Sequence, residues 1–323
     1  MEKARKLAQC ACVALAWSCL SPGAVALSAD PDFLPGVQVG TVGTTAVNEA
    51  SGLAGSRANP DVLWTHNDSG DSARAFALNT QGTLLGTYNI LGAGAVDWED
   101  MTVGPGPLAG QQYLYLGDIG DNSANRGVSR PPIVVYRVAE PAVSAGQSPV
   151  NVNLTGAAAF TLSYPDGARD AETLMVDPLT GDLYVVSKRE ARSRVYRVPA
   201  AQLVDGATIT MEFKAELDWG GTTGGDISPD GTEVLIRRYA DAALWRRPGS
   251  GNLWDAFPGS PFAVPLRSEP QGEAIAFDAQ GSGYFTVSEG TNQPIYYFER
   301  VPEPVAGLLL IAASPLLRRR RRR

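Results

Sequence analysis

Carboxylates dominate the residues of this chain that could carry out chemistry. An acidic residue opens each of five similar segments, and loops rich in Asp, Asn and Gly follow. The five acids are Glu49, Glu99, Glu172, Asp226 and Glu273. Two of the loops read His66-Asn-Asp-Ser-Gly-Asp71 and Gly117-Asp-Ile-Gly-Asp-Asn122. Carboxylate and amide oxygens are the hard donors that Ca²⁺ prefers, and glycine lets a loop wrap tightly around such an ion.

The densest acidic stretch supplies the predicted metal ligands. It contains the start of the second segment and the loop that follows within the same segment. We predict that it holds Ca²⁺ or a similar divalent ion; the sequence carries no haem, flavin or nucleotide signature. The predicted ligands are Asp97, Glu99, Asp100, Asp118, Asp121 and Asn122. The alternative is a charged rim that stays hydrated and holds no ion.

Basic residues in the corresponding loops of later segments allow a second interpretation. They are Lys188, Arg189, Arg237 and Arg238. Carboxylates that share one site repel each other, so they are paired with cations or their pKa values rise. The basic side chains either neutralise the acids or, beside a metal ion, bind an anion such as a phosphate group.

Composition excludes several other chemistries. The three cysteines all lie within the first 19 residues, and the only histidine is His66. The rest of the chain therefore has no disulfide and no thiol nucleophile, and a multi-histidine zinc site is impossible. A Ser-His-Asp triad would have to use His66. Carboxylate–metal chemistry requires neither residue type.

The distribution of charge indicates what the protein does not bind. The formal charge of the chain is −7, but three basic residues lie in the first 26 residues and six form Arg318–Arg323. Without these two segments 18 basic residues remain against 33 acidic ones, a charge near −15. Such a surface repels nucleic acids and anionic membranes, so neither is an expected partner.

Short strands, rather than helices, must position these residues. Between Val37 and Arg300 runs of β-branched or aromatic residues are ended by Gly, Pro, Asn or Asp, and no long segment has helical periodicity. Each segment contains about four such runs, which is typical of one blade of a propeller. The sequence therefore predicts an all-β fold, a β-propeller of five four-stranded blades, with a β-sandwich as the alternative.

The spacing of the segments leaves the number of blades open at one point. The second and third acids are 73 residues apart, against 47 to 54 residues elsewhere, so a degenerate sixth blade could lie between them. Residues 37–47 precede the first segment and are predicted to close the ring as the outer strand of the last blade. In this topology the five acids and the charged loops surround one mouth of the channel.

The N-terminus has the three parts of a secretory signal peptide. Basic residues come first, an apolar stretch extends from Leu7 to Leu20, and Ala24-Val25-Ala26 is a small-residue cleavage site. The predicted partners of this segment are the Sec translocon and signal peptidase. The predicted domains are the signal peptide over 1–26, the propeller over 27–300 and a sorting signal over 301–323.

The C-terminus carries a second export feature. Pro302-Glu303-Pro304 is followed by an apolar run, predicted to form a short transmembrane helix, and by arginines that include Arg318, Arg319 and Arg320. This order resembles the PEP-CTERM sorting signal. The resemblance implies a Gram-negative host and cleavage by an exosortase-type transpeptidase, in systems that accompany exopolysaccharide export. The arginines would keep the tail on the cytoplasmic side, so the protein would be anchored transiently in the inner membrane and then reach the cell surface or extracellular matrix.

The acidic loops carry a further resemblance. The runs Leu63-Trp-Thr-His-Asn-Asp-Ser-Gly-Asp71, Asp97-Trp-Glu-Asp100 and Gly117-Asp-Ile-Gly-Asp-Asn122 look like those of secreted propellers loosely related to phytase-like and esterase-like families. β-Propeller phytases imply a Ca²⁺-lined channel that, with Lys and Arg, binds and cleaves phosphate esters. No residue is transferred from these families as catalytic.

We therefore predict an exported, Ca²⁺-binding propeller that acts as a ligand- or matrix-binding module. A Ca²⁺-dependent phosphoesterase that uses the same mouth is one alternative, and a structural spacer without a ligand is another. The predicted ligand is an exopolysaccharide or a phosphorylated small molecule. The residue patterns are compatible with both an enzyme and a binding protein.

Overall fold

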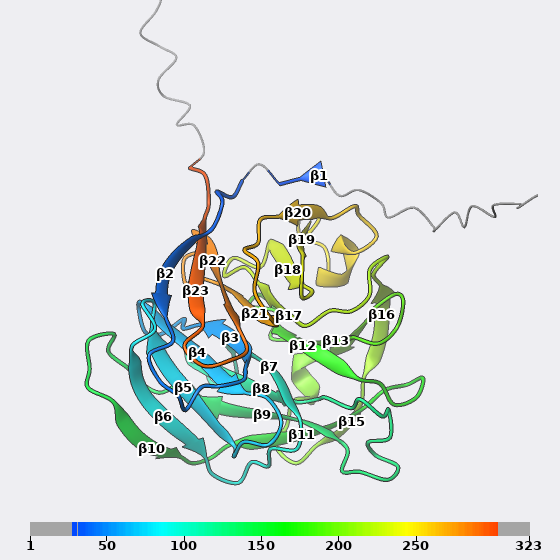
Figure 1. Ribbon diagram of the computed structural model, residues 1–323. Coiled ribbons are helices and arrows are strands. Elements are labelled where there is room, and N and C mark those ends of the chain that lie inside the picture. The colour runs from blue at the N-terminus through cyan, green and yellow to red at the C-terminus, as the bar shows by residue number, and fades with distance from the viewer. Residues whose placement is uncertain (1–27, 31, 303–323) are drawn as a thin grey trace, which may run out of the picture.

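Five twisted sheets surround a central axis in the computed structural model, which describes residues 28–30 and 32–302 (Figure 1). The predicted all-β fold, a β-propeller of five blades, is confirmed. The two described helices, η1 (Ala200–Gln202) and η2 (Leu253–Ala256), are single 3₁₀ turns, and neither is long enough to cross a membrane. The predicted signal peptide lies outside the described residues, as does the sorting signal beyond Pro302.

Each blade has four antiparallel strands, which follow one another from the innermost to the outermost. Blade 1 contains β3 (Ala50–Gly55), β4 (Val62–Asn67), β5 (Arg74–Asn79) and β6 (Leu84–Ile90). Blade 2 contains β7 (Trp98–Pro105), β8 (Gln112–Asp118), β9 (Ile133–Ala139) and β11 (Ala158–Ser163). Blade 3 contains β12 (Ala171–Val176), β13 (Leu183–Ser187), β14 (Arg194–Val198) and β16 (Glu212–Glu216). Blade 4 contains β17 (Gly224–Ile227), β18 (Glu233–Arg237), β19 (Ala242–Arg246) and β20 (Phe262–Val264). Blade 5 contains β21 (Gly272–Phe277), β22 (Gly283–Ser288), β23 (Pro294–Glu299) and β2 (Val37–Thr41).

The long spacing between the second and third segments does not contain a sixth blade. Its extra residues form β10 (Val150–Leu154), which pairs in parallel with β6 at the outer edge of blade 1. The chain then returns as β11 to complete blade 2. Two similar additions, β15 (Thr208–Thr210) and β1 (Ser28–Ala29), extend blades 2 and 4. These parallel strands cover outer edges that would otherwise be open to pairing with another chain.

Strand β2 closes the ring, as predicted for residues 37–47. It pairs antiparallel with β23, so that Val37 lies opposite Tyr297 and Thr41 lies opposite Pro294. The inner strands contact one another in the order β3, β7, β12, β17 and β21, and β21 contacts β3. An N-terminal strand therefore completes the C-terminal blade and ties the two ends of the propeller together.

The core lies between the blades. Side chains alternate between the two faces of each strand, so both faces of a sheet can pack against a neighbouring blade. Five buried apolar clusters result, and each draws its residues from two adjacent blades. Trp64 and Trp98 pack between blades 1 and 2, and Trp245 packs between blades 3 and 4. This packing holds the loops at each face in position.

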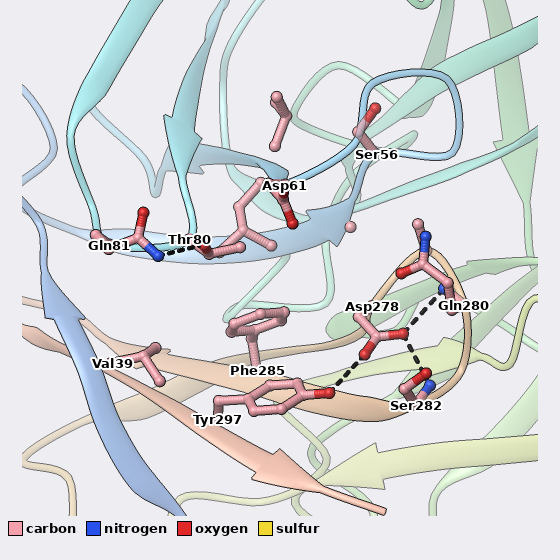
Figure 2. A pocket seen from close by; sticks show the side chains of 14 residues that line it. Val39, Ser56, Asp61, Thr80, Gln81, Asp278, Gln280, Ser282, Phe285 and Tyr297 are labelled. Atoms are coloured by element: carbon pink, nitrogen blue, oxygen red, sulfur yellow. Dashed lines mark hydrogen bonds between the residues drawn. The ribbon is translucent and has the colours of Figure 1, made fainter. Parts of the chain in front are cut away.

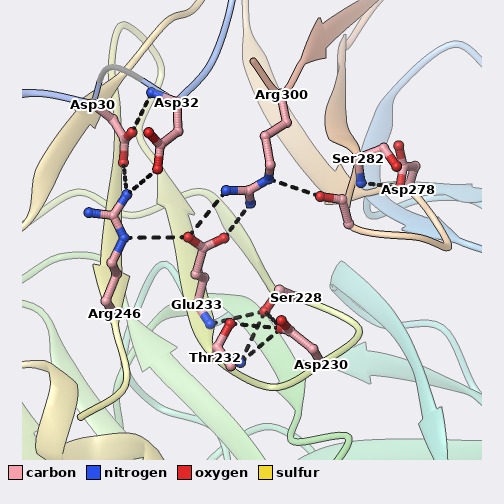
Figure 3. A network of polar contacts seen from close by, with 11 residues as sticks. Asp30, Asp32, Ser228, Asp230, Thr232, Glu233, Arg246, Asp278, Ser282 and Arg300 are labelled. Atoms are coloured by element: carbon pink, nitrogen blue, oxygen red, sulfur yellow. Dashed lines mark hydrogen bonds and ion pairs between the residues drawn. The ribbon is translucent and has the colours of Figure 1, made fainter. Parts of the chain in front are cut away.

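Both described ends of the chain leave the propeller on one face, which we call the terminal face. The Leu34 amide donates to the Glu299 carbonyl at 2.8 Å, and the Val301 amide donates to the Asp32 carbonyl at 2.7 Å. An ion network joins the two ends: Arg246 lies 2.7 Å from Asp32, and Glu233 bridges Arg246 and Arg300 (Figure 3). The loops that precede the inner strands, and those between the second and third strands, lie on the opposite face.

Candidate functional site

Carboxylates converge on the face opposite the chain ends. The carboxylate oxygens of Asp68, Asp97 and Glu99 lie within 4.8 Å of one another, and so do those of Glu99, Asp170 and Glu172. Glu273 lies near these carboxylates, because it raises the pKa values of Asp68, Glu172 and Glu289. We call this set the acidic mouth: Asp68, Asp97, Glu99, Asp170, Glu172, Glu273 and Glu289.

A β-bulge directs three glutamates into the mouth. The register of β7, β12 and β21 shifts between the first and third residue of each strand. The residue between them is Glu99, Glu172 or Glu273, which is left out of the strand pairing. A bulge redirects the side chain of its extra residue. The same local irregularity in three blades therefore places three carboxylates at one level.

The other two acids predicted for a five-membered ring lie at different positions. Glu49 precedes the bulge of blade 1 and is exposed at the rim. Asp226 is the third residue of β17, which has no register shift, and it is buried. It accepts hydrogen bonds from the amides of Ile227 and Phe277, and Arg57 lies 3.4 Å away. The five acids thus do not form one ring. The position of each acid relative to the bulge, and not its order in the chain, decides how deep in the channel its carboxylate lies.

The first triad, formed by Asp68, Asp97 and Glu99, has little positive charge around it. Glu99 is only 4% exposed, and its carboxylate has no hydrogen bond or ion pair with a described residue. The nearest cation is Arg130, whose guanidinium lies 3.7 Å from Asp97 and is one-third exposed. Burying a charge without a partner is costly. This triad is therefore the part of the mouth whose negative charge the described residues compensate least.

The loop after β8 closes over the first triad with bare backbone. A side-chain carbon added at Gly120 would lie 2.0 Å from Glu99 Oε1 and 2.8 Å from Asp97 Cγ. Asp118 holds the loop by accepting hydrogen bonds from the Asp97 amide at 2.9 Å and from Arg126 Nη1 at 2.7 Å. A glycine is required here because any larger residue would fill the space between the carboxylates.

The second triad, formed by Glu99, Asp170 and Glu172, contains its own cations. Lys188 Nζ forms an ion pair with Glu172 and donates to Tyr239 Oη at 3.0 Å. Arg189 forms an ion pair with Asp170, and its Nη2 lies 3.8 Å from Glu172 Oε1. Two basic side chains therefore neutralise much of this triad without an added ion.

The pKa values in the mouth rise, as expected for crowded and buried carboxylates. Burial, and then Glu273 and Asp97, raises the pKa of Asp68 to about 6. Burial, and then the neighbouring carboxylates, raises the pKa of Glu99 well above its ordinary value. Burial raises the pKa of Glu172 to about 8 against the opposing effect of Lys188, and burial with Glu273 raises that of Glu289 to about 9. Ionising all of these carboxylates together is therefore costly, because the basic residues of the mouth do not offset their burial and mutual repulsion.

Four of the six predicted metal ligands support the mouth without lining it. Asp100 is fully buried and accepts hydrogen bonds from the Met101 and Leu174 amides. Asp118 and Asp121 hold the loop around Gly120, while Asn122 accepts a hydrogen bond from Arg189. Only Asp97 and Glu99 of that set lie in a triad.

Asp170 is the triad member that sequence reasoning missed. Asp170-Ala-Glu172 has the same pattern as Asp97-Trp-Glu99. In both, the Asp directly precedes the inner strand and the Glu is the bulged residue. This repeated Asp-X-Glu pattern was the available signal. Asp68 lies in the first acidic loop of the sequence, and the structure brings it to the same site.

The four predicted anion-binding residues divide into two pairs. Lys188 and Arg189 lie at the mouth, where they contact carboxylates. Arg237 does not line it: its side chain is fully buried 2.9 Å from Glu269 and donates to the Ala274 carbonyl. Arg238 pairs with Asp241 and lies over the Trp219 ring. Arg237 and Arg238 are therefore already engaged in ion pairs and in contacts with neighbouring strands and loops.

Neither a family model nor a curated protein matches this chain. Among solved structures, one chain in the crystal structure of a nidogen/laminin complex is similar to it, with 12% sequence identity and a TM-score of 0.42. The similarity covers 75% of this chain and 73% of that chain.

Proposed function

We propose that this protein is an exported β-propeller whose acidic mouth binds one divalent cation, Ca²⁺, and through it an oxygen-rich ligand. The observation that carries the proposal is Glu99, a buried carboxylate without a partner among the described residues, which lies against two further carboxylates. A buried unpaired carboxylate either takes up a proton or binds a cation. The two outcomes differ in their dependence on Ca²⁺, so they can be separated by experiment.

The ligand chemistry favours Ca²⁺ at the first triad over other metals. All three groups offer carboxylate oxygens, whereas zinc sites commonly use nitrogen or sulfur ligands. Three carboxylates supply at most six oxygens, and Ca²⁺ takes about six to eight. Asp68 is partly exposed, so water or a ligand from outside can complete the coordination. A Ca²⁺ at this position would present open coordination sites to the solvent.

The ligand is proposed to carry anionic oxygens, as in a phosphorylated small molecule or an acidic exopolysaccharide. Arg189 is half exposed, at 51%, and lies on the side of Glu99 where the second triad is. An anion bound to the cation would therefore meet a guanidinium group, which binds such oxygens strongly. The same observation favours a second candidate function, a Ca²⁺-dependent phosphoesterase, because metal and guanidinium together stabilise a charged transition state.

The position of the chain ends supports the proposed export and anchoring. The described ends leave on the terminal face, opposite the acidic mouth. If the C-terminal arginines hold the tail in the inner membrane until an exosortase-type enzyme cleaves it, the mouth is directed away from that membrane. The proposed ligand would then have free access before and after release to the cell surface or matrix.

Thermal unfolding of the purified full chain with and without CaCl₂ tests the cation site. Bound Ca²⁺ should stabilise the fold by about 2.7 kcal/mol at a hundredfold excess over its dissociation constant. Glu99→Gln keeps the shape of the side chain but removes its charge, so it should abolish this shift. Glu216→Gln on the outer strand of blade 3 is the control and should leave it unchanged. The proposal would be contradicted if millimolar Ca²⁺ left the melting temperature of the native protein unchanged.

Assays with phosphate monoesters and diesters separate the two candidate functions. Turnover that requires Ca²⁺ and is lost in Arg189→Gln would favour the phosphoesterase. Binding of the same esters without turnover, detected by calorimetry on the Ca²⁺-loaded protein, would favour the binding module. Arg238→Gln is a matched control, because Arg238 is already paired with Asp241 away from the triads.

A further inference from the structure

A cavity of about 350 Å³ opens on the terminal face between blades 5 and 1 (Figure 2). Its lining comes from β2, from the turns after β3, β5 and β21, and from the strands that follow or flank them. Small-molecule sites range from about 300 to 1,000 Å³, so this cavity suits a ligand of one ring. It is separate from the acidic mouth, which lies at the other end of the strands.

Aromatic side chains form the apolar wall of the cavity. The rings of Phe285 and Tyr297 have centroids 4.7 Å apart and are inclined by 39°. Tyr297 Oη donates a hydrogen bond to Asp278 Oδ2 at 2.7 Å, which fixes the orientation of the ring (Figure 2). Val62 and Leu63 add aliphatic surface. A rigid aromatic wall of this kind can pack against the C–H face of a sugar ring.

Polar side chains line the rest of the cavity, Asp61 and Gln81 on blade 1 and Gln280 on the turn after β21. Asp61, Gln81 and Gln280 line the rim, and the side chains of Asp61 and Gln280 have no hydrogen bond to a described residue. Amides both donate and accept, and a carboxylate accepts only, so the rim offers partners for several hydroxyl groups. Asp61 also adopts a φ of +59°, a backbone conformation that non-glycine residues occupy uncommonly. Such positions often mark functional sites.

Charge restricts the ligand further. Neither Lys nor Arg is among the described residues that line the cavity, whereas two carboxylates, Asp61 and Asp278, are. An anionic sugar would meet repulsion without a compensating cation. The combination of an aromatic wall, side-chain amides, of which Gln81 already donates one hydrogen bond to Thr80, and a carboxylate acceptor fits a neutral ring that carries many hydroxyl groups.

We propose that this cavity binds one neutral hexose unit of a glycan, packed on Tyr297 and hydrogen-bonded to Asp61 and Gln81. A second cavity, of about 290 Å³, lies between blades 4 and 5 and shares Gln280 with the first. Ser228, Thr232 and Glu233 line it with hydroxyl and carboxylate groups (Figure 3). A glycan held in the first cavity can therefore continue across the turn that carries Gln280.

Saturation-transfer NMR with glucose, galactose and mannose tests this site on the purified full chain. At least one of these neutral hexoses should bind, and glucuronate should bind at least tenfold more weakly. Asp61→Gly should weaken hexose binding at least tenfold, because it removes the carboxylate. Its melting temperature should be unchanged or higher, since glycine accepts a positive φ without strain.

Asn292→Gly is the matched control. Asn292 also has a positive φ, of 55°, but it lies in the loop between β22 and β23 on the mouth face. This variant should bind hexose as the native protein does. The proposal is overturned if none of the three hexoses binds at tens of millimolar, or if Asp61→Gly binds like the native protein. Ca²⁺-induced stabilisation should persist in Asp61→Gly, so failure of the cation proposal remains a separate outcome.

Discussion

The two carboxylate triads share Glu99 and differ in what neutralises them. In the triad toward blade 3, Lys188 and Arg189 contact Glu172 and Asp170 directly. In the triad toward blade 1, the nearest cation is Arg130, one-third exposed and 3.7 Å from Asp97. Lysine and arginine side chains of the protein therefore neutralise one half of the mouth. In the other half, no lysine or arginine among the described residues is buried against the carboxylates in this way.

The difference arises from the loops between the second and third strands. In blade 3 this loop begins Ser187-Lys-Arg-Glu190, whereas in blades 1 and 2 the loops contain Asp, Asn and Gly. A side-chain ammonium is held permanently by the fold, and breaking a buried pair leaves an uncompensated charge. A bound ion can exchange and can keep positions open for a ligand. We infer that the exchangeable half is the part of the mouth that carries function.

Lys188→Met should produce the largest effect, because it removes the more deeply buried of the two cations in the second triad. Removing one partner of a buried ion pair costs about 3 to 5 kcal/mol in unfolding free energy. Ca²⁺ should restore much of this loss by occupying the second triad, so the stoichiometry measured by calorimetry should rise from one ion to two. Lys214→Met, at a more exposed pair with Glu212, should change stability by less than about 1 kcal/mol. An unchanged stoichiometry without rescue would refute this account of the two triads.

Gly120→Ala should act mainly on the first triad, through Glu99 and Asp97. The new methyl carbon would lie 2.0 Å from Glu99 Oε1 and 2.8 Å from Asp97 Cγ, so these carboxylates would have to move and the space proposed for the ion would be filled. The dissociation constant for Ca²⁺ should rise at least tenfold, about 1.4 kcal/mol of binding free energy. Gly146→Ala is the control, because a methyl group there meets no neighbour within 4 Å. Equal Ca²⁺ affinity in Gly120→Ala and the native protein would place the ion elsewhere.

The pH dependence should have opposite signs with and without Ca²⁺. The folded-state pKa values of Asp68, Glu172 and Glu289 are raised, to about 6, 8 and 9, so the folded protein holds protons that the unfolded chain has lost. Stability of the ion-free protein should therefore fall as pH rises from the ordinary carboxyl range through these values. Ca²⁺-induced stabilisation should instead disappear as pH falls below about 6, where Asp68 is protonated. Melting curves across this range check both trends, and a flat ion-free profile would contradict the first.

Arg189→Gln should have the smallest effect of the series. Its guanidinium is half exposed, so solvent screens the pair and the loss of stability should stay below about 1 kcal/mol. Removing a positive charge near Glu99 should tighten Ca²⁺ binding slightly. Calorimetry at low and high salt measures this, and weaker binding at low salt would show that Arg189 orders the site instead of competing with the ion.

The architecture was largely predictable from local patterns. Runs of β-branched and aromatic residues between turn residues indicated five blades, and residues 37–47 indicated the closing strand. The detour of β10 to blade 1 was not predictable, because a parallel pairing on an outer edge leaves no mark on the local alternation of residues. The acidic loops indicated the face on which the carboxylates gather, and Asp97 and Glu99 of the predicted ligands lie in that cluster.

The amino-acid sequence by itself determined which segments alternate as strands, where they turn and which loops carry charge, since these depend on neighbours within a few residues. Only the tertiary structure decided which charges meet. The bulges place Glu99 at a different depth in the channel from Glu49 and Asp226. Arg237 forms a buried ion pair with Glu269, and Lys188 forms one with Glu172. These outcomes depend on distances between side chains in different strands and blades. Electrostatic energy varies with those distances and with burial, so the register and packing of the whole ring must be known before it can be assessed.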